Sequence, residues 1–412
     1  MSGSGSGSGS GVGAGSGSGV GVGVGVGAWE ARIRAQLVVV VEEDRWRAPK
    51  EFDARGPAGV LQGDAVVSFA SNDYLGLSAH PAVVAAAHEA LDRWGAGSGA
   101  SRLVTGSRPI HSTLERALAE WKGTEAAVTF PTGFAANLGV LCVLGGPGVG
   151  VLSDELNHAS IIDGCRLSRS PLAVYRHRDM GHLDELLSAR SGSASATPTI
   201  VVSDSVFSMD GDVAPVDELL DLCGRHGALL VLDEAHAVLG PDLPPTVRAG
   251  GGAVVRVGTL SKTLGSLGGF VAASRDVIDL LVNRARPYIF STAPTPADTA
   301  AALAALRVLR SAEGSALTGR LASLIDRVVE AGLAPPGHPS PIIPIVLGPE
   351  QAALDASAAL LDEGLWVPAI RPPTVPVGTS RLRVTLSAAH GDEDVDRLLH
   401  ALLRLRRPAA AL

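Results

Sequence analysis

Lysine is scarce in this chain of 412 residues and occurs only at Lys50, Lys122 and Lys262. Nearly all of the 34 basic residues are therefore arginines. Arginine suffices where only a positive charge is needed, whereas lysine offers an amine that can lose its proton and react. We therefore expect Lys262, which follows a predicted strand, to serve amine chemistry. A surface lysine is the alternative interpretation.

Other absences narrow the class of protein. Cys142, Cys165 and Cys223 are isolated and form no CxxC pair, so we expect a reducing, cytoplasmic location without disulfides. The 11 histidines form no HExxH pattern, and no metal is expected. Net charge is −8 and basic residues are dispersed, which argues against nucleic acid as a partner. No apolar run approaches the ~18–20 residues of a membrane helix.

The chain divides by composition. Glycine occupies every odd position from Gly3 to Gly27, and residues 1–27 are interpreted as a disordered tail rather than a secretory signal. The remainder, with 46% hydrophobic residues in the whole chain, suffices for one large domain and a smaller one. We expect an N-terminal helix and arm at 28–70, a large domain at 71–292 and a small domain at 293–412.

Short apolar runs alternate with helical patterns, which predicts an α/β doubly wound sheet. The predicted strands are Ala126–Phe130, Val149–Leu152, Thr199–Val202, Ala228–Leu232 and Ala253–Val257. The predicted helices include 28–50, His111–Lys122 with Ser112 and Glu115 as a capping box, Val277–Arg286 and Ala297–Val329. The C-terminal part then alternates strand and helix, as expected of a smaller α+β domain.

Asp233 and Lys262 follow two neighbouring predicted strands, and open α/β sheets bind ligands at the carboxyl ends of their strands. Pyridoxal phosphate (PLP) needs such a pair, because lysine forms its Schiff base and aspartate keeps the pyridine nitrogen protonated. Gly133 and Phe134 after another strand could bind the phosphate with backbone N–H groups at a helix start. Thr259 could add a hydroxyl.

Other candidates have an ordinary alternative as well as a functional one. His158 could stack on a ring, and His236 or Ser208 could reach the ring oxygen; otherwise each is a polar turn residue. Arg371 lies in a proline-rich, rigid segment suited to binding a carboxylate. Arg102 lies in a loop of small residues that either is flexible or approaches a substrate closely.

Ten stretches together resemble one family, the α-oxoamine synthases, PLP enzymes of the aspartate aminotransferase-like fold (PLP-dependent transferase fold type I). The resemblance covers the chain from about Trp29 to the end, and the stretches follow one another in order: SNDYLGL at 71–77, GSGASRLVTG at 97–106, TGFAAN at 132–137, NHASI at 157–161, VFSMDGD at 206–212, DEAH at 233–236, GTLSKTLG at 258–265, FST at 290–292, IRPPTVP at 370–376 and RLRVTLSAAH at 381–390. The resemblance implies a mixed, mostly parallel sheet in a large domain plus a smaller α+β C-terminal domain.

The resemblance also implies roles for individual residues. Lys262 would be the Schiff-base lysine, Asp233 the pyridinium partner and His158 the ring-stacking residue. Further cofactor contacts would come from Gly133, Phe134, Ser208, His236, Thr259 and, across a homodimer interface, Thr292. Substrate contacts would come from Arg47, Asn72, Arg371 and Thr374.

The branch of the family that the chain resembles most condenses L-alanine with a pimeloyl thioester, of CoA or acyl carrier protein, in biotin biosynthesis. Carbon dioxide and a free thiol are released. The alternatives are a sister synthase of the 2-amino-3-ketobutyrate CoA ligase or 5-aminolevulinate synthase type, which uses glycine, and a non-catalytic PLP-binding protein. The chain departs from the family after His236, where Ala237–Gly240 is about two residues shorter and the 241–247 loop differs.

Overall fold

The computed structural model describes residues 26–43, 45–191, 197–241, 243 and 254–406. The chain forms two compact units, Met1–Lys50 and Glu51–Leu412. In the first unit, helix α1 (Val26–Glu42) exposes apolar side chains such as Trp29 and Ile33. The helix was expected over 28–50, but it ends at Glu42. Most of the predicted tail at 1–27 lies outside the described residues.

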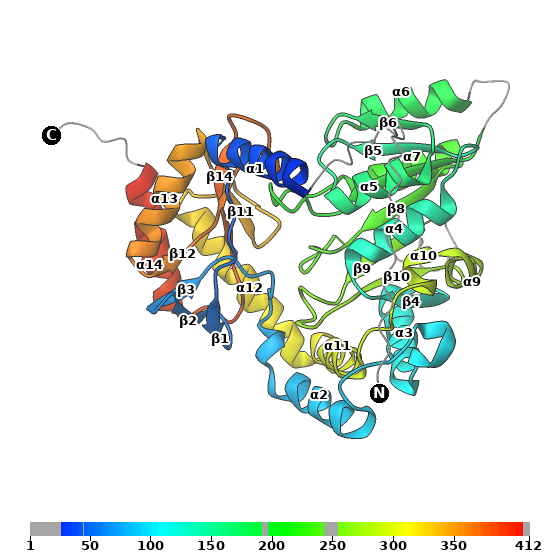
Figure 1. Cartoon of the computed structure of the whole chain (residues 1–412), viewed down its shortest axis with the longest axis horizontal. Helices are drawn as coiled ribbons and strands as arrows, with labels where there is room; N and C mark the ends of the chain where they lie inside the picture. The colour runs from blue at the N-terminus through cyan, green and yellow to red at the C-terminus, as the bar shows by residue number, and fades with distance from the viewer. Residues whose placement is uncertain (1–25, 44, 192–196, 242, 244–253, 407–412) are drawn as a thin grey trace, which may run out of the picture. The chain divides into compact units, whose positions relative to one another are not determined.

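The second unit is built on a seven-stranded sheet with the order β4-β10-β9-β8-β7-β5-β6 (Figure 1). Strand β10 is antiparallel to both of its neighbours, whereas the strand pairs from β9 to β6 are parallel. This confirms the predicted mixed, mostly parallel sheet. The strands are β4 (Ala126–Phe130), β5 (Gly150–Asp154), β6 (Leu172–Tyr175), β7 (Thr199–Asp204), β8 (Leu229–Asp233), β9 (Val254–Thr259) and β10 (Gly269–Ala273).

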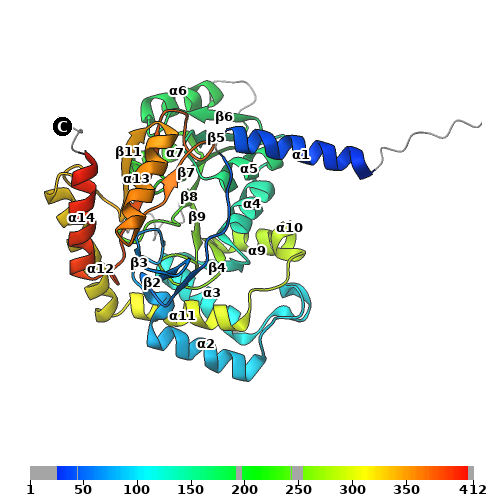
Figure 2. The same ribbon diagram turned by 60° about the vertical axis from the view of Figure 1, so that its left-hand side comes forward.

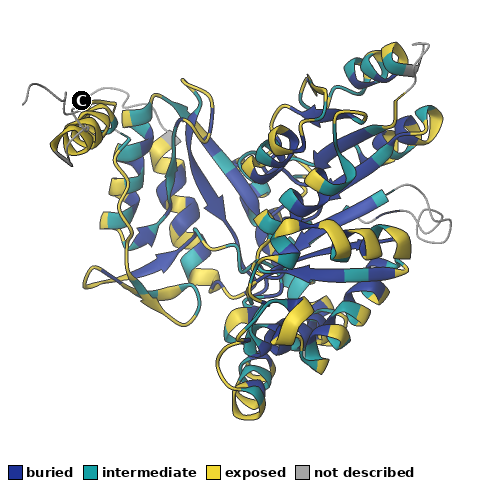
Figure 3. Cartoon of the chain, turned by 45° about the vertical axis from the view of Figure 1, so that its right-hand side comes forward, coloured by how far each residue is buried: buried dark blue, intermediate teal, exposed yellow. Residues whose placement is uncertain are grey.

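Both faces of this sheet are covered by helices, as Figure 3 shows by the buried strands between them. Along β7, Val202 packs into the core under one set of helices and Val201 into the core under the other, because side chains alternate along a strand. The first set comprises α4 (Gly133–Leu144), α5 (Ala159–Ser168), α9 (Arg275–Arg284) and α10 (Arg286–Ile289). The second comprises α6 (Met180–Ser191) and α7 (Val216–His226).

A third core joins the remaining helices to two small sheets of order β1-β2-β3-β12 and β11-β14-β13. Helices α2 and α11 lie side by side in Figures 1 and 2. The helices are α2 (Pro81–Trp94), α3 (Pro109–Lys122), α11 (Pro296–Leu309), α12 (Ala312–Glu330), α13 (Glu350–Asp362) and α14 (Asp392–Arg406). The strands are β1 (Phe52–Ala54), β2 (Ala58–Leu61), β3 (Asp64–Ser68), β11 (Ile342–Gly348), β12 (Leu365–Trp366), β13 (Ala369–Ile370) and β14 (Ser380–Thr385). Two short helical turns, Leu77–Ala79 and Arg102–Gly106, precede α2 and α3.

Two helix expectations were wrong. The single helix predicted over 297–329 is two helices, α11 and α12, because the Ser311 hydroxyl accepts a hydrogen bond from Gly314 N and begins a new helix. The capping box of Ser112 and Glu115 is also absent from the described structure. Helix α3 starts earlier, and there His111 Nδ1 accepts from the backbone N–H of Arg108.

The predicted boundary between domains 71–292 and 293–412 falls within one compact unit and stays a prediction. None of the described helices is long and apolar enough to cross a membrane.

Candidate active site

A cavity of about 190 Å³ lies where the carboxyl ends of β7, β8 and β9 meet the start of α4. This location is the one expected for ligands of open α/β sheets. It contains seven of the nine residues predicted to bind the cofactor. The complete lining is Thr132, Gly133, Phe134, Asn137, His158, Ser160, Asp204, Asp233, Ala235, His236, Gly258, Thr259, Ser261 and Lys262.

Asp233 ends strand β8 and is held by donors on both carboxylate oxygens. The side-chain amide of Asn137 donates to Oδ2 at 2.7 Å, and the backbone N–H of Ala235 donates to Oδ1 at 2.9 Å. The side chain is buried, yet its hydrogen-bond donors are neutral. An anion fixed in this way can hold a proton on a ring nitrogen in the cavity.

Lys262 lies in the same cavity, on the turn after β9. Burial lowers the pKa of its amine below the usual value, while Asp233 and Asp204 oppose that shift. A lowered pKa increases the fraction of neutral amine, which is the form that acts as a nucleophile or base. The lysine is therefore placed for the amine chemistry that its scarcity in the sequence suggested.

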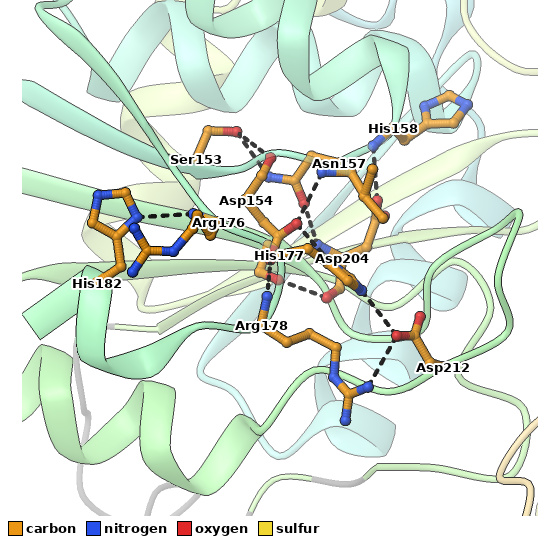
Figure 4. A network of polar contacts seen from close by, with 12 residues as sticks. Ser153, Asp154, Asn157, His158, Arg176, His177, Arg178, His182, Asp204 and Asp212 are labelled. Atoms are coloured by element: carbon orange, nitrogen blue, oxygen red, sulfur yellow. Dashed lines mark hydrogen bonds and ion pairs between the residues drawn. The ribbon is translucent and has the colours of Figure 1, made fainter. Parts of the chain in front are cut away.

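His158 caps the start of α5 and borders the cavity. Its backbone N–H donates to Asp204 Oδ2 at 2.8 Å (Figure 4). Its Nδ1 lies 2.7 Å from the Ser160 hydroxyl. Burial lowers the pKa of the imidazole, which favours a neutral ring. A neutral, fixed aromatic ring is suited to stacking on a planar cofactor.

The first turn of α4 offers backbone donors to an anion. The first amides of a helix have no acceptor within the helix. The Thr132 hydroxyl satisfies one of them by accepting from Ala135 N, and the Thr132 carbonyl accepts the first regular helical hydrogen bond, from Ala136 N. The amides of Gly133 and Phe134 are the remaining donors of that turn, and both residues line the cavity. Together with the Thr259 hydroxyl, they fit a phosphate ester.

His236 is buried at the cavity wall and accompanied by Tyr74, which the sequence analysis did not assign a role. The Tyr74 hydroxyl lies 2.5 Å from His236 Nδ1. Burial lowers the pKa of His236 well below its usual value and raises that of Tyr74. The phenol therefore keeps its proton; donation of that proton to Nδ1, the nearer of its two acceptors, would leave the imidazole proton on Nε2.

The remaining predicted contacts do not line this cavity in the described structure. The Ser208 carbonyl accepts from Arg383 Nε at 2.6 Å, and Thr292 forms a backbone bridge with Ser101. Asn72 Oδ1 accepts from Arg383 Nη2 at 3.1 Å.

The predicted substrate residues lie on other segments. The Arg371 carbonyl accepts from Thr374 N at 3.1 Å, in the segment after β13. Arg47 belongs to the unit Met1–Lys50. The roles proposed for these residues stay predictions.

Arg102 has a structural role, whereas the sequence suggested either a flexible loop or a loop that approaches a substrate closely. It is buried, and its guanidinium forms a salt bridge of 2.7 Å with Glu115. Glu115 in turn accepts from the backbone N–H of Thr129 in β4. The interaction ties the loop to the sheet.

Several residues around the cavity were not identified from the sequence, among them Asn137, Asp204 and Tyr74. Asp204 ends β7 directly opposite Asp233, so the strand-end argument used for Asp233 could have found it. Burial raises the pKa of Asp204 well above its usual value, and the adjacent Asp233 adds to this. Asn137 and Tyr74 lie within quoted motifs, but their partners are distant in sequence.

The shortened turn after His236 is described only in part. In Ala237–Gly240 the backbone N–H of Val238 donates to the His236 carbonyl. Most of the divergent loop at 241–247 lies outside the described residues.

Comparison with known proteins places the geometry in context. Residues 64–402 match the model of the family "Aminotransferase class I and II". The 8-amino-7-oxononanoate synthase of Anaeromyxobacter dehalogenans (strain 2CP-1 / ATCC BAA-258) is 54% identical over 359 residues, which cover 85% of this chain and 88% of that protein. The synthase of the same name from Geobacter sulfurreducens is 46% identical, covering 85% and 92% of the two chains.

Solved structures agree with the fold. Serine palmitoyltransferase of Sphingomonas wittichii superposes with a TM-score of 0.81 at 31% identity, covering 92% of this chain and 96% of that one. A serine palmitoyltransferase structure containing PLP superposes with a TM-score of 0.81 at 30% identity, covering 92% and 98%. The 8-amino-7-oxononanoate synthase of Francisella tularensis, at 24% identity and a TM-score of 0.65, covers 82% and 97% and supports the fold alone.

The fold and the cavity define a PLP-dependent transferase. The chain belongs to the class I and II aminotransferase family and, within it, to the family of 8-amino-7-oxononanoate synthases.

Proposed function

We propose that this chain condenses L-alanine with a pimeloyl thioester and releases 8-amino-7-oxononanoate, carbon dioxide and the free thiol, as a step of biotin biosynthesis. One observation carries the proposal: a chain 54% identical to such a synthase brings Lys262, Asp233 and His158 into one cavity. Bound PLP supplies an electron-accepting ring that stabilises negative charge on the α-carbon of alanine.

Lys262 is the proposed catalytic base and the covalent anchor of the cofactor. Its Nζ would take the proton from the α-carbon of alanine and later return one. The lowered pKa of the amine supports this role, because more of it is neutral near pH 7 than in an exposed lysine.

The other cavity residues would hold the cofactor in place. Asp233 would keep the ring nitrogen protonated, and His158 would lie against one ring face. His236 would donate its Nε2 proton to the ring oxygen, with Ser208 as a second donor. Gly133, Phe134 and Thr259 would bind the phosphate through two amides and a hydroxyl.

We place the amino-acid carboxylate on Arg371, since an arginine in a rigid segment suits bidentate binding. Asn72, Thr374 and Arg47 are the proposed contacts of the acyl substrate. Thr292 would reach the phosphate in a second copy, so the working form would be a homodimer. The cytoplasm is the proposed location, supported by three free cysteines.

Thiol release from pimeloyl-CoA and from pimeloyl-acyl carrier protein, each with alanine or glycine, tests the proposal. We expect release with alanine and little with glycine. Turnover with glycine alone would replace it with a sister synthase. A protein that binds PLP but releases no thiol would be a non-catalytic PLP-binding protein, and a purified protein that binds no PLP would refute the PLP assignment.

A further inference from the structure

His177 lies outside the cavity lining and between two carboxylates (Figure 4). It follows strand β6, and its Nδ1 is 2.9 Å from Asp154 Oδ1 at the end of β5. Its Nε2 is 2.8 Å from Asp212 Oδ2, in the loop that follows β7. The ring also packs edge-on against Phe207, with centroids 4.4 Å apart.

Hydrogen bonding defines the charge on this ring. The oxygens of Asp154 also accept from the backbone N–H groups of Leu156 and Arg178, both at 2.9 Å, so Asp154 is an acceptor in all three contacts. Asp212 Oδ2 accepts from Arg178 Nη1 at 3.0 Å as well. Both nitrogens of His177 must therefore donate, and a neutral imidazole has only one N–H. His177 is an imidazolium in this arrangement.

The electrostatics agree with the geometry. Burial opposes the charge on His177, but the hydrogen bonds to Asp154 and Asp212 raise the pKa of the imidazole to about 9. In the same network the pKa of Asp212 stays below its usual value despite burial, because His177 and Arg178 stabilise the carboxylate. Asp154, Asp212 and Arg178 are the charged groups around His177 in the described structure.

The two carboxylates belong to two segments, and the first of them, the turn 154–158, reaches the cavity lining through His158. Asp154 begins the turn 154–158, which continues through Asn157 to His158. Asn157 Oδ1 accepts from Asp204 N, and Asp204 accepts from His158 N, both at 2.8 Å.

Asp212 closes the loop 207–212, where Phe207 N donates to the Asp212 carbonyl at 3.0 Å. This loop carries Ser208, whose carbonyl binds Arg383, and Asp210, which pairs with Arg381 of β14. His177 therefore joins the turn that carries His158 to the loop that carries Ser208.

We propose that the His177 imidazolium is a positioning residue that fixes the turn 154–158 against the loop 207–212 and so sets the placement of His158 and Ser208 at the cofactor. This inference rests on the proposed function for the roles of those two residues. His177 touches neither cofactor nor substrate and acts only through Asp154 and Asp212.

Purified His177→Gln protein tests the inference, with His182→Gln as the matched control. His182 lies nearby, and its Nδ1 accepts from a single backbone N–H, that of Arg176. The measurements are PLP affinity, the circular dichroism of bound PLP in the visible range, and the pH dependence of both. For His177→Gln we expect affinity about tenfold weaker, within the usual range of coupling between sites, and an altered dichroism signal. His182→Gln should match the wild type.

The pH dependence separates positioning from simple stabilisation. In the wild type the dichroism signal should change as pH rises through about 9, where His177 loses its proton, and this change should be missing in His177→Gln. A His177→Gln protein that melts earlier but binds PLP with unchanged affinity, dichroism and pH profile would overturn the inference. If His177→Gln does not fold, Asp212→Asn removes one arm alone and must give a weaker form of the same changes. Unchanged PLP binding in Asp212→Asn would then overturn the inference.

Failure of the proposed function would look different. Wild-type protein would then bind no PLP or release no thiol, whatever residue 177 is.

Discussion

Asp233 and Glu234 are neighbours at the end of β8, but their carboxylates have opposite surroundings. Asp233 borders the cavity with neutral donors, and the amine of Lys262 shares that space. Glu234 is not part of the cavity lining and forms ion pairs with two cations: its Oε2 lies 2.8 Å from Lys122 Nζ, and its Oε1 lies 2.7 Å from Arg256 Nε.

The difference shows what decides whether a buried lysine is chemical or structural. Lys122 and Glu234 are both almost fully buried and held in one ionic contact, so Lys122 serves as a plain cation. The premise that this chain uses arginine wherever a cation alone is needed therefore does not hold at Lys122. Lys262 borders open space and has a lowered pKa, and none of the described residues forms a direct ion pair with it.

The largest expected effect is on activity, from removing the cavity amine. Lys262→Ala should reduce kcat/KM for thiol release by about 10⁴-fold, the upper range for a general base, and leave the free energy of unfolding near the wild-type value. Lys50→Ala, which removes an exposed lysine, is the matched control and should keep full activity. A Lys262→Ala protein with substantial turnover would contradict the role of the amine.

The next largest expected effect is a loss of stability when the carboxylate of Glu234 is neutralised. Glu234→Gln leaves Lys122 and Arg256 buried without their shared anion, and we expect the free energy of unfolding to fall by about 3–5 kcal/mol. Urea denaturation of the PLP-free protein measures it. Glu120→Gln, which removes an exposed partner of Arg310, should stay close to the wild type. Equal stability of the two variants would show that the buried cluster contributes little.

Tyr74→Phe tests a neutral hydrogen bond at the cavity wall, between Tyr74 and His236. It removes the donor to His236 Nδ1, and we expect a cost of about 1–3 kcal/mol, seen as weaker PLP binding and lower kcat. Tyr175→Phe alters a buried hydroxyl outside the cavity lining and should leave PLP binding unchanged. Identical PLP affinity in both variants would rule out a role of Tyr74 in orienting His236.

The smallest effect concerns pH. The pKa of His177 is raised in the folded protein, so its stabilising contribution is complete below the usual pKa of about 6.5 and is lost as pH rises through about 9. The difference in unfolding free energy between the wild type and His177→Gln should therefore shrink between these values. A difference that stays constant up to pH 10 would exclude a charged His177.

Local patterns predicted the sheet well where strands are buried on both faces. Ala126–Phe130 has the bounds expected of it, and Asp233 and Lys262 were found because both follow such strands. Strand β6 (Leu172–Tyr175) was missed because it is a half-exposed edge strand, and β10 (Gly269–Ala273) because it consists mostly of glycine and alanine. The break between α11 and α12 was missed because apolar spacing continues across Ser311.

Sequence reasoning located site residues where a single side chain at the end of a strand carries the chemistry, as at Asp233 and Lys262. Site residues were missed where a contact joins distant segments. Tyr74 and His236 are 162 positions apart, and Asn137 and Asp233 are 96 apart. Only the folded chain brings these partners together, so no spacing in the sequence could have indicated them.

The most direct test of the account follows the carboxyl carbon of alanine. Wild-type protein with PLP, pimeloyl-CoA and L-alanine labelled at the carboxyl carbon should release the label as carbon dioxide and form unlabelled 8-amino-7-oxononanoate, identified by mass spectrometry. Lys262→Ala should form neither. Label retained in the condensation product, or product formed without Lys262, would contradict the account.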